Sequence, residues 1–148
     1  MSSELENKLA EEIKSQFPNA EVKVQRKFRI SLSIDKESII EIARYLREIG
    51  FDQAVSVSGV DKIKENMFIV VYHIWSTSKK VLASLKTQVP RDNPNLPSLV
   101  KIFESVNWHE KETHEMFGIN FEGHPDLGRL LLPEGWEGKF PLRKDFVK

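Results

Sequence analysis

The chain has 148 residues, a formal net charge of zero from 22 basic and 22 acidic side chains, and no cysteine. Zero net charge argues against non-specific binding to nucleic acid or anionic lipid. The lack of cysteine excludes disulfides, thiol nucleophiles, zinc-thiolate sites and cysteine-ligated iron-sulfur clusters. The length predicts one domain. No apolar run reaches the ~20 residues that span a bilayer, and residues 1–7 lack the apolar core of a secretory signal, so we expect a soluble cytoplasmic protein.

The N-terminal third predicts a helix, a strand and a second helix. A capping box at Ser3 and Glu6 starts a four-residue apolar repeat that Pro18 ends, which predicts the first helix. Apolar and polar residues then alternate over 22–34, apart from Arg26, which predicts one long strand with one buried face. Asp35 is the expected cap of a second helix that Gly50 ends.

The middle of the chain predicts three more strands. A strand beginning at Val55, a polar turn over 59–66 and an apolar strand over 67–75 are typical of a hairpin, and 81–89 alternates as a fourth strand. Three prolines over 90–97 predict a loop, followed by a short helix over 99–103. The expected fold is α+β, with a mainly antiparallel four-stranded sheet, helices on one face, and an extended irregular C-terminal tail. We assign 1–106 to the core and 107–148 to a docking helix and tail of the same unit.

Residues 107–118, NWHEKETHEMFG, look at first like a metal-binding helix. The zinc motif H-E-x-x-H needs its second histidine at 113, which is threonine, and His114 comes one residue late. A spacing of five puts His109 and His114 about 140° apart around a helix, so they do not share an ion. The spacing of Asn107 and Glu110 instead predicts a capped helix that Gly118 ends. We therefore expect no metal site in this stretch.

The segment 118–148 holds five of the seven glycines and three of the seven prolines, yet it is rich in large apolar residues. Irregular segments of this length are unusual in a small domain. Two interpretations remain open: a strap over the chain's own core, or a segment lying on another protein. We favour the second, because anchors spaced by Gly and Pro suit an extended path along a partner. Asp126, Arg129 and Arg143 would add directional polar contacts.

Four stretches of this region resemble the 30 kDa subunit family of respiratory complex I, the NADH-quinone oxidoreductase. They are EKETHEMFGI (110–119), FEGHPDL (121–127), RLLLP (129–133) and PLRKDF (141–146), and VSGVD (57–61) and VVYH (70–73) extend the likeness upstream. The resemblance covers roughly residues 50–146. Lys111 and Gly128 stand where the family usually has arginine, and the chain ends soon after PLRKDF. These departures, and the absence of a fused large subunit, favour the related membrane-bound hydrogenase branch.

The resemblance implies a non-catalytic subunit in the peripheral arm of a membrane-associated, ion-translocating oxidoreductase. Such a chain binds no cofactor itself and docks on the large subunit that forms the quinone site or holds a NiFe centre. Iron-sulfur subunits would be further partners, on the cytoplasmic side of the membrane, and contact with the membrane would come only through partners. The alternatives are a free-standing protein-binding module and a metal-dependent hydrolase using His109, Glu110, Glu112, His114 and His124.

The predicted partner interface combines two kinds of residue. The apolar or shape anchors are Met116, Phe117, His124, Pro125, Leu132 and Trp136. The polar contacts are Glu110, Glu112, Asp126, Arg129 and Arg143. For several of them a purely structural role is an equal alternative: Met116 and Phe117 as core residues, Glu110 as a helix cap, and His124 as a turn residue before proline.

Overall fold

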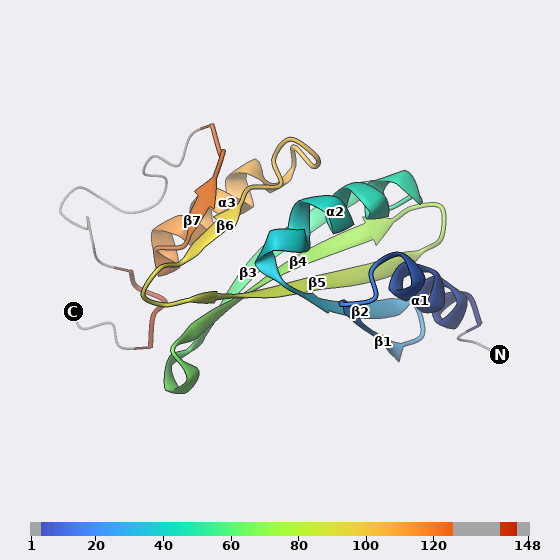
Figure 1. Ribbon diagram of the computed structural model, residues 1–148. Coiled ribbons are helices and arrows are strands. Elements are labelled where there is room, and N and C mark those ends of the chain that lie inside the picture. Colours follow the sequence, from blue (N-terminus) through green and yellow to red (C-terminus); the bar gives the residue numbers. More distant parts are fainter. Residues whose placement is uncertain (1–3, 126–139, 145–148) are drawn as a thin grey trace.

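A mixed sheet covered by helices on one face forms the body of the protein in a computed structural model, which describes residues 4–125 and 140–144 (Figure 1). The sheet order is β1-β2-β5-β4-β3. Its strands are β1 (Glu21–Arg26), β2 (Arg29–Ile34), β3 (Gln53–Lys62), β4 (Met67–Ser76) and β5 (Val81–Pro90). The helices are α1 (Glu4–Gln16), α2 (Ile39–Glu48) and α3 (Val106–Phe117). Short strands β6 (Asn95–Pro97) and β7 (Asn120–Glu122) pair in parallel, and 3-10 turns occupy η1 (Lys36–Ser38) and η2 (Ile63–Glu65).

The predicted four-stranded sheet is wrong in strand number and in one pairing. The long strand predicted over 22–34 is two antiparallel strands, β1 and β2, joined by a tight turn at which Phe28 adopts a left-handed φ of 68°. Arg26, which interrupts the alternation, is the last residue of β1. β2 pairs in parallel with β5, whereas the other neighbours in this sheet are antiparallel. The α+β class and the β3–β4 hairpin are confirmed.

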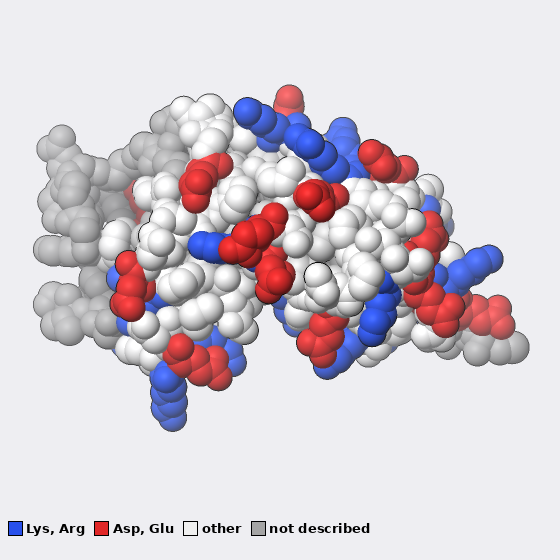
Figure 2. Space-filling view, in the orientation of Figure 1, with Lys and Arg blue, Asp and Glu red and all other residues white. Residues whose placement is uncertain are grey.

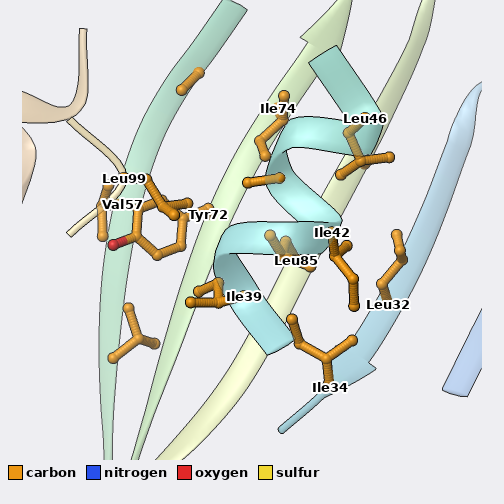
Figure 3. Packing of buried hydrophobic residues seen from close by; sticks show 14 of the residues in the cluster. Leu32, Ile34, Ile39, Ile42, Leu46, Val57, Tyr72, Ile74, Leu85 and Leu99 are labelled. Carbon is orange, nitrogen blue, oxygen red and sulfur yellow. The ribbon is translucent and has the colours of Figure 1, made fainter. Parts of the chain in front are cut away.

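The core lies between the sheet and α2 (Figure 3). Three fully buried residues of α2, Ile39, Ile42 and Leu46, recur at helical spacing and face the sheet. Leu85 projects from β5 on the side of the sheet that α2 covers. The Tyr72 ring on β4 is directed toward Val57 and Leu99 instead, and its hydroxyl bonds to Glu110. Burying each such aliphatic side chain contributes about 1.5–3 kcal/mol, so the apolar stripe of α2 is a main source of the sheet's stability.

Local expectations around α3 need correction. The helix predicted over 99–103 is a pair of turns, in which Phe103 N–H donates to the Leu99 carbonyl. Asn107 lies inside α3 and is not its cap, which is Ser105. Gly118 ends α3 as predicted, in the left-handed conformation (φ 78°) that glycine adopts readily. Asp35 precedes η1 but its side chain makes no capping hydrogen bond.

Charge on the surface is mixed, in keeping with the zero net charge. Basic and acidic side chains are interspersed on the side of the molecule shown in Figure 2. Within the described residues, no helix is both long enough and apolar enough to cross a membrane.

Candidate functional site

The middle of α3 is held to the sheet by a fully buried carboxylate, Glu110. The Tyr72 hydroxyl on β4 donates to Glu110 Oε2 at 2.6 Å, and the Leu99 N–H donates to the same oxygen at 3.0 Å. The Ser98 hydroxyl donates to Oε1. Glu110 therefore joins α3, β4 and the segment after β6, and it does not close the capping box that its spacing from Asn107 predicts.

The electrostatics of this cluster reflect competition between burial and hydrogen bonding. Burial raises the pKa of Glu110, and the donors Ser98, Tyr72 and Leu99 N–H oppose that rise because they stabilise the ionised form. The pKa of Tyr72 lies well above its ordinary value because of burial, and the adjacent carboxylate adds to the effect. A phenol that keeps its proton is a dependable donor, so the geometry suits a structural connection between helix and sheet.

The C-terminal end of α3 is fixed by contact between Phe117 and β3. The Phe117 ring lies directly over Gly59, where a Cβ atom would come within 2.7 Å of it. The same ring packs edge-on against Phe68, with centroids 5.9 Å apart. Glycine at 59 thus lets α3 approach the strand closely, and Phe117, at 6% exposure, is a core residue of the protein.

Residues 140–144 pack on the protein's own domain. Leu142 N–H donates to the Met116 carbonyl at 3.0 Å, and Arg143 Nε donates to the Phe117 carbonyl at 2.7 Å. Lys144 N–H donates at 2.8 Å to Asp61, a buried carboxylate that also forms a two-pronged pair with Arg91 at 2.9 and 3.1 Å. For this short segment the strap interpretation holds.

A groove of about 220 Å3 runs between α3 and β3 where the strap begins. Its lining brings together three of the predicted interface residues, Glu112, Met116 and Phe117, with the exposed Leu142. Trp108, 53% exposed, precedes Glu112 and Met116 at four-residue steps on the same side of α3. Exposed apolar side chains gathered beside a groove are typical of a protein-protein contact. We call Trp108, Glu112, Met116 and Leu142 the α3 surface.

The other predicted interface residues are placed as follows. His124 is half-buried, with Nε2 3.1 Å from the Asn107 carbonyl, and Pro125 is exposed beside it. Arg143 makes the internal contacts described above. Asp126, Arg129, Leu132 and Trp136 lie outside the described residues. The partner contacts proposed for all of these remain predictions.

Candidate metal ligands do not gather in the described part of the protein. Within residues 4–125 and 140–144, no group of three or more His, Asp or Glu side chains is arranged to hold a metal ion. His114 instead directs Nδ1 toward the Ile119 carbonyl at 2.9 Å, just past the end of α3.

Sequence reasoning missed four residues that shape this region: Gly59, Asp61, Tyr72 and Ser98. Their partners are distant along the sequence, as with Tyr72 and Glu110, which are separated by 38 positions. Trp108 on the α3 surface was also missed, and for it a local signal existed, because its spacing from Glu112 and Met116 indicates a shared helix side.

Residues 32–148 match the model of a known family, described as the respiratory-chain NADH dehydrogenase, 30 Kd subunit. The protein belongs to this family. It is 39% identical over 141 residues to the C subunit of the F(420)H(2) dehydrogenase of Methanosarcina mazei, covering 93% of this chain and 89% of that protein. It is 44% identical over 120 residues to the C subunit of the NADH-quinone oxidoreductase of a Roseiflexus species, covering 78% and 68%.

Two solved structures share the fold. One polypeptide of the membrane-bound sulfane sulfur reductase, an archaeal respiratory membrane complex, superposes with a TM-score of 0.90 at 27% identity, covering 97% of this chain and 86% of that one. A trypsin-resistant fragment of Nqo5 superposes with a TM-score of 0.70 at 26% identity, covering 86% and 100%. Together these relatives indicate that this protein is a subunit of a complex I-like or membrane-bound respiratory complex.

Proposed function

We propose that this protein is a non-catalytic docking subunit in the peripheral arm of its complex. It binds the large subunit that carries the quinone site or a NiFe centre, through the α3 surface and the tail. The observation that carries the proposal is the α3–β3 groove, where exposed apolar residues and predicted interface residues meet.

The contacts behind the α3 surface suit this role. Glu110 fixes the middle of the helix to the sheet, and the packing of Phe117 on Gly59 fixes its C-terminal end. A surface held rigid before binding loses less conformational entropy on association, which raises affinity. The subunit would thus contribute to electron transfer by holding cofactor-bearing partners in fixed positions.

We further propose that the electron donor and acceptor are set by other subunits. The relatives are named for F(420)H(2) dehydrogenase, NADH-quinone oxidoreductase and sulfane sulfur reductase, although they share this subunit's fold or sequence. Iron-sulfur clusters, and a quinone site or a NiFe centre, would belong to those partners. Association with the cytoplasmic side of the membrane, and membership of the hydrogenase branch, are part of the same proposal.

The test is purification of the intact complex from membranes in mild detergent, with a tag after Lys148. Mass spectrometry would identify the co-purifying proteins, and assays of hydrogen evolution and quinone reduction would choose between the branches. Recovery with a large subunit and iron-sulfur proteins supports docking. Recovery of the tagged protein alone, stable and protease-resistant, favours the free-standing module.

A matched pair of variants tests the α3 surface itself. Leu142 and Leu5 are both exposed leucines, at 56% and 44%, on different parts of the molecule. Leu142→Asp places a charge beside the groove and should lower recovery of the large subunit at least tenfold. Leu5→Asp on α1 should leave recovery unchanged. Equal recovery with both variants would contradict docking through the α3 surface.

A further inference from the structure

The face of the sheet opposite the helices is uncovered by any described element. α1, α2 and α3 all lie on the other face (Figure 1), and the strap at 140–144 contacts Asp61 and Phe68, which also point to that side. Because side chains alternate along a strand, a distinct set of residues occupies the uncovered side. We call this set the open face and define it by Arg29, Ile69, Val71, His73, Trp75 and Lys86.

The centre of the open face is more apolar than a solvated sheet face requires. Antiparallel sheets with one face in water usually place polar residues there. Here β4 contributes Ile69 and Trp75, both half-buried, and Val71, only 9% exposed. The neighbouring Ser84 is also buried, with its hydroxyl 3.3 Å from His73 Nδ1. A centre of small and apolar side chains suits contact with another protein.

Two basic residues, Arg29 and Lys86, lie beside this apolar centre. Arg29 and Lys86 are close enough to His73 that both help to lower its pKa, after burial, which is the larger cause. Among the described residues neither of them makes an ion pair, whereas Lys23 on β1 is neutralised by Glu21 at 3.0 Å. The protein as a whole is neutral, so this positive region is a local segregation of charge. Its natural complement is a surface of carboxylates.

We propose that the open face is a second docking surface, which binds an acidic surface of another protein subunit of the same complex. This inference rests on the proposed function, since it requires an assembled complex. A protein partner fits better than a lipid surface, because the apolar side chains lie on a strand of the sheet and do not project from loops. A hollow of about 430 Å3 at the end of β2 borders the open face at Ile69 and Lys86 and gives room for a partner side chain. Its lining also includes two carboxylates, Asp35 and Glu37, so the charge complementarity to an acidic partner comes from Arg29 and Lys86.

The experiment uses the tagged complex and the isolated protein side by side. A carbodiimide links lysine amines to carboxylates in direct contact, so we expect Lys86 to be crosslinked to an Asp or Glu of a neighbouring subunit. Hydroxyl-radical footprinting should oxidise Trp75 at least fivefold more slowly in the complex than in the isolated protein. Equal oxidation of Trp75 in both samples would overturn the open-face inference while leaving docking through the α3 surface intact.

Charge-reversed variants separate this surface from general effects of charge. Arg29→Glu with Lys86→Glu should reduce recovery of the crosslinked subunit at least tenfold, with an unchanged circular dichroism spectrum. The control, Arg44→Glu with Lys101→Glu, changes two exposed cations on the helix side and should keep that subunit. Equal recovery of the subunit with both double variants would contradict the inference.

Two further outcomes are distinguishable. The isolated protein is also footprinted with vesicles of phosphatidylglycerol and phosphatidylcholine. If the vesicles slow the oxidation of Trp75 as much as assembly into the complex does, the open face binds anionic lipid and the protein-partner inference is wrong. If the protein purifies without any partner, the proposed function and the open-face inference fail together.

Discussion

Replacing Glu110 with alanine would leave buried hydrogen-bond donors without an acceptor. The Tyr72 hydroxyl and the Leu99 N–H both point at one carboxylate oxygen, in a region from which water is excluded. Each buried donor left unsatisfied costs about 1–3 kcal/mol, so the two together predict a loss of roughly 2–6 kcal/mol. Small domains are stable by only about 5–15 kcal/mol, so the loss would be a large share of the free energy of unfolding.

Urea unfolding followed by tryptophan fluorescence and circular dichroism would measure this loss. Glu110→Gln is the informative comparison, since its amide oxygen can accept both donors and its NH2 group can donate to the Ser98 hydroxyl. We expect it to cost less than about 1.5 kcal/mol. Glu112→Ala, two residues further along α3 on the exposed side, should change stability by at most about 0.5 kcal/mol. A loss below about 1 kcal/mol for Glu110→Ala, or equal losses for alanine and glutamine, would refute the account of Glu110 as a buried acceptor.

Three further predictions follow from the contacts around α3 and the sheet. Gly59→Ala should destabilise the protein by about 1–3 kcal/mol in urea unfolding, because its Cβ would overlap the Phe117 ring. Asp61→Asn should cost roughly 3–5 kcal/mol and expose the segment after Phe140 to trypsin, because it breaks a buried ion pair and weakens the bond to Lys144 N–H. Since the pKa of His73 is lowered in the folded state, its contribution to stability is present above about pH 6.5 and is lost as the pH falls below it.

The first two of these predictions have matched controls, and the third is tested by comparing the wild type with a His73 variant. Ser58→Ala, on the exposed position beside Gly59, should be nearly neutral, and a neutral Gly59→Ala would contradict the overlap. Asp52→Asn changes an exposed carboxylate and should leave the tryptic pattern unaltered. The difference in unfolding free energy between the wild type and His73→Gln should shrink as the pH is lowered from 7.5 to 5, and a pH-independent difference would exclude the His73 effect.

Local periodicity predicted the elements whose burial follows a regular pattern. The apolar stripe of α2 and the alternation of β5 correspond to their buried residues, and in α1 the stripe holds at Leu9 and Ile13 but not at Leu5, which is exposed. The apolar run over 67–75 correctly predicted a strand, β4. The turn between β1 and β2 was missed because it contains neither Gly nor Asn, and Phe28 takes a left-handed conformation instead. The predicted helix over 99–103 was wrong because an apolar pair at i and i+4 fits a single turn equally well.

The candidate site was less accessible to sequence reasoning because its contacts are distant along the sequence. Glu110 has the spacing of a helix cap, and only the placement of Tyr72 and Ser98 beside it shows that it is a buried acceptor. The role of Arg143 within the domain depends in the same way on where α3 ends. The α3 surface was partly predicted, since Glu112 and Met116 were selected from a family resemblance that the family match then confirmed.

The parallel pairing of β2 with β5 has a consequence for how the protein folds. β3, β4 and β5 are consecutive in the sequence and can form a meander as soon as residues 53–90 are available. Pairing of Ile30 with Ala83 instead closes a loop that contains α2, β3 and β4. Closing that long loop is entropically unfavourable until there is an edge to pair with. The meander should therefore form first and serve as the template, with the β1–β2 hairpin adding to the exposed edge of β5 late in folding. Until that addition, the edge of β5 is unpaired and open to pairing with another molecule.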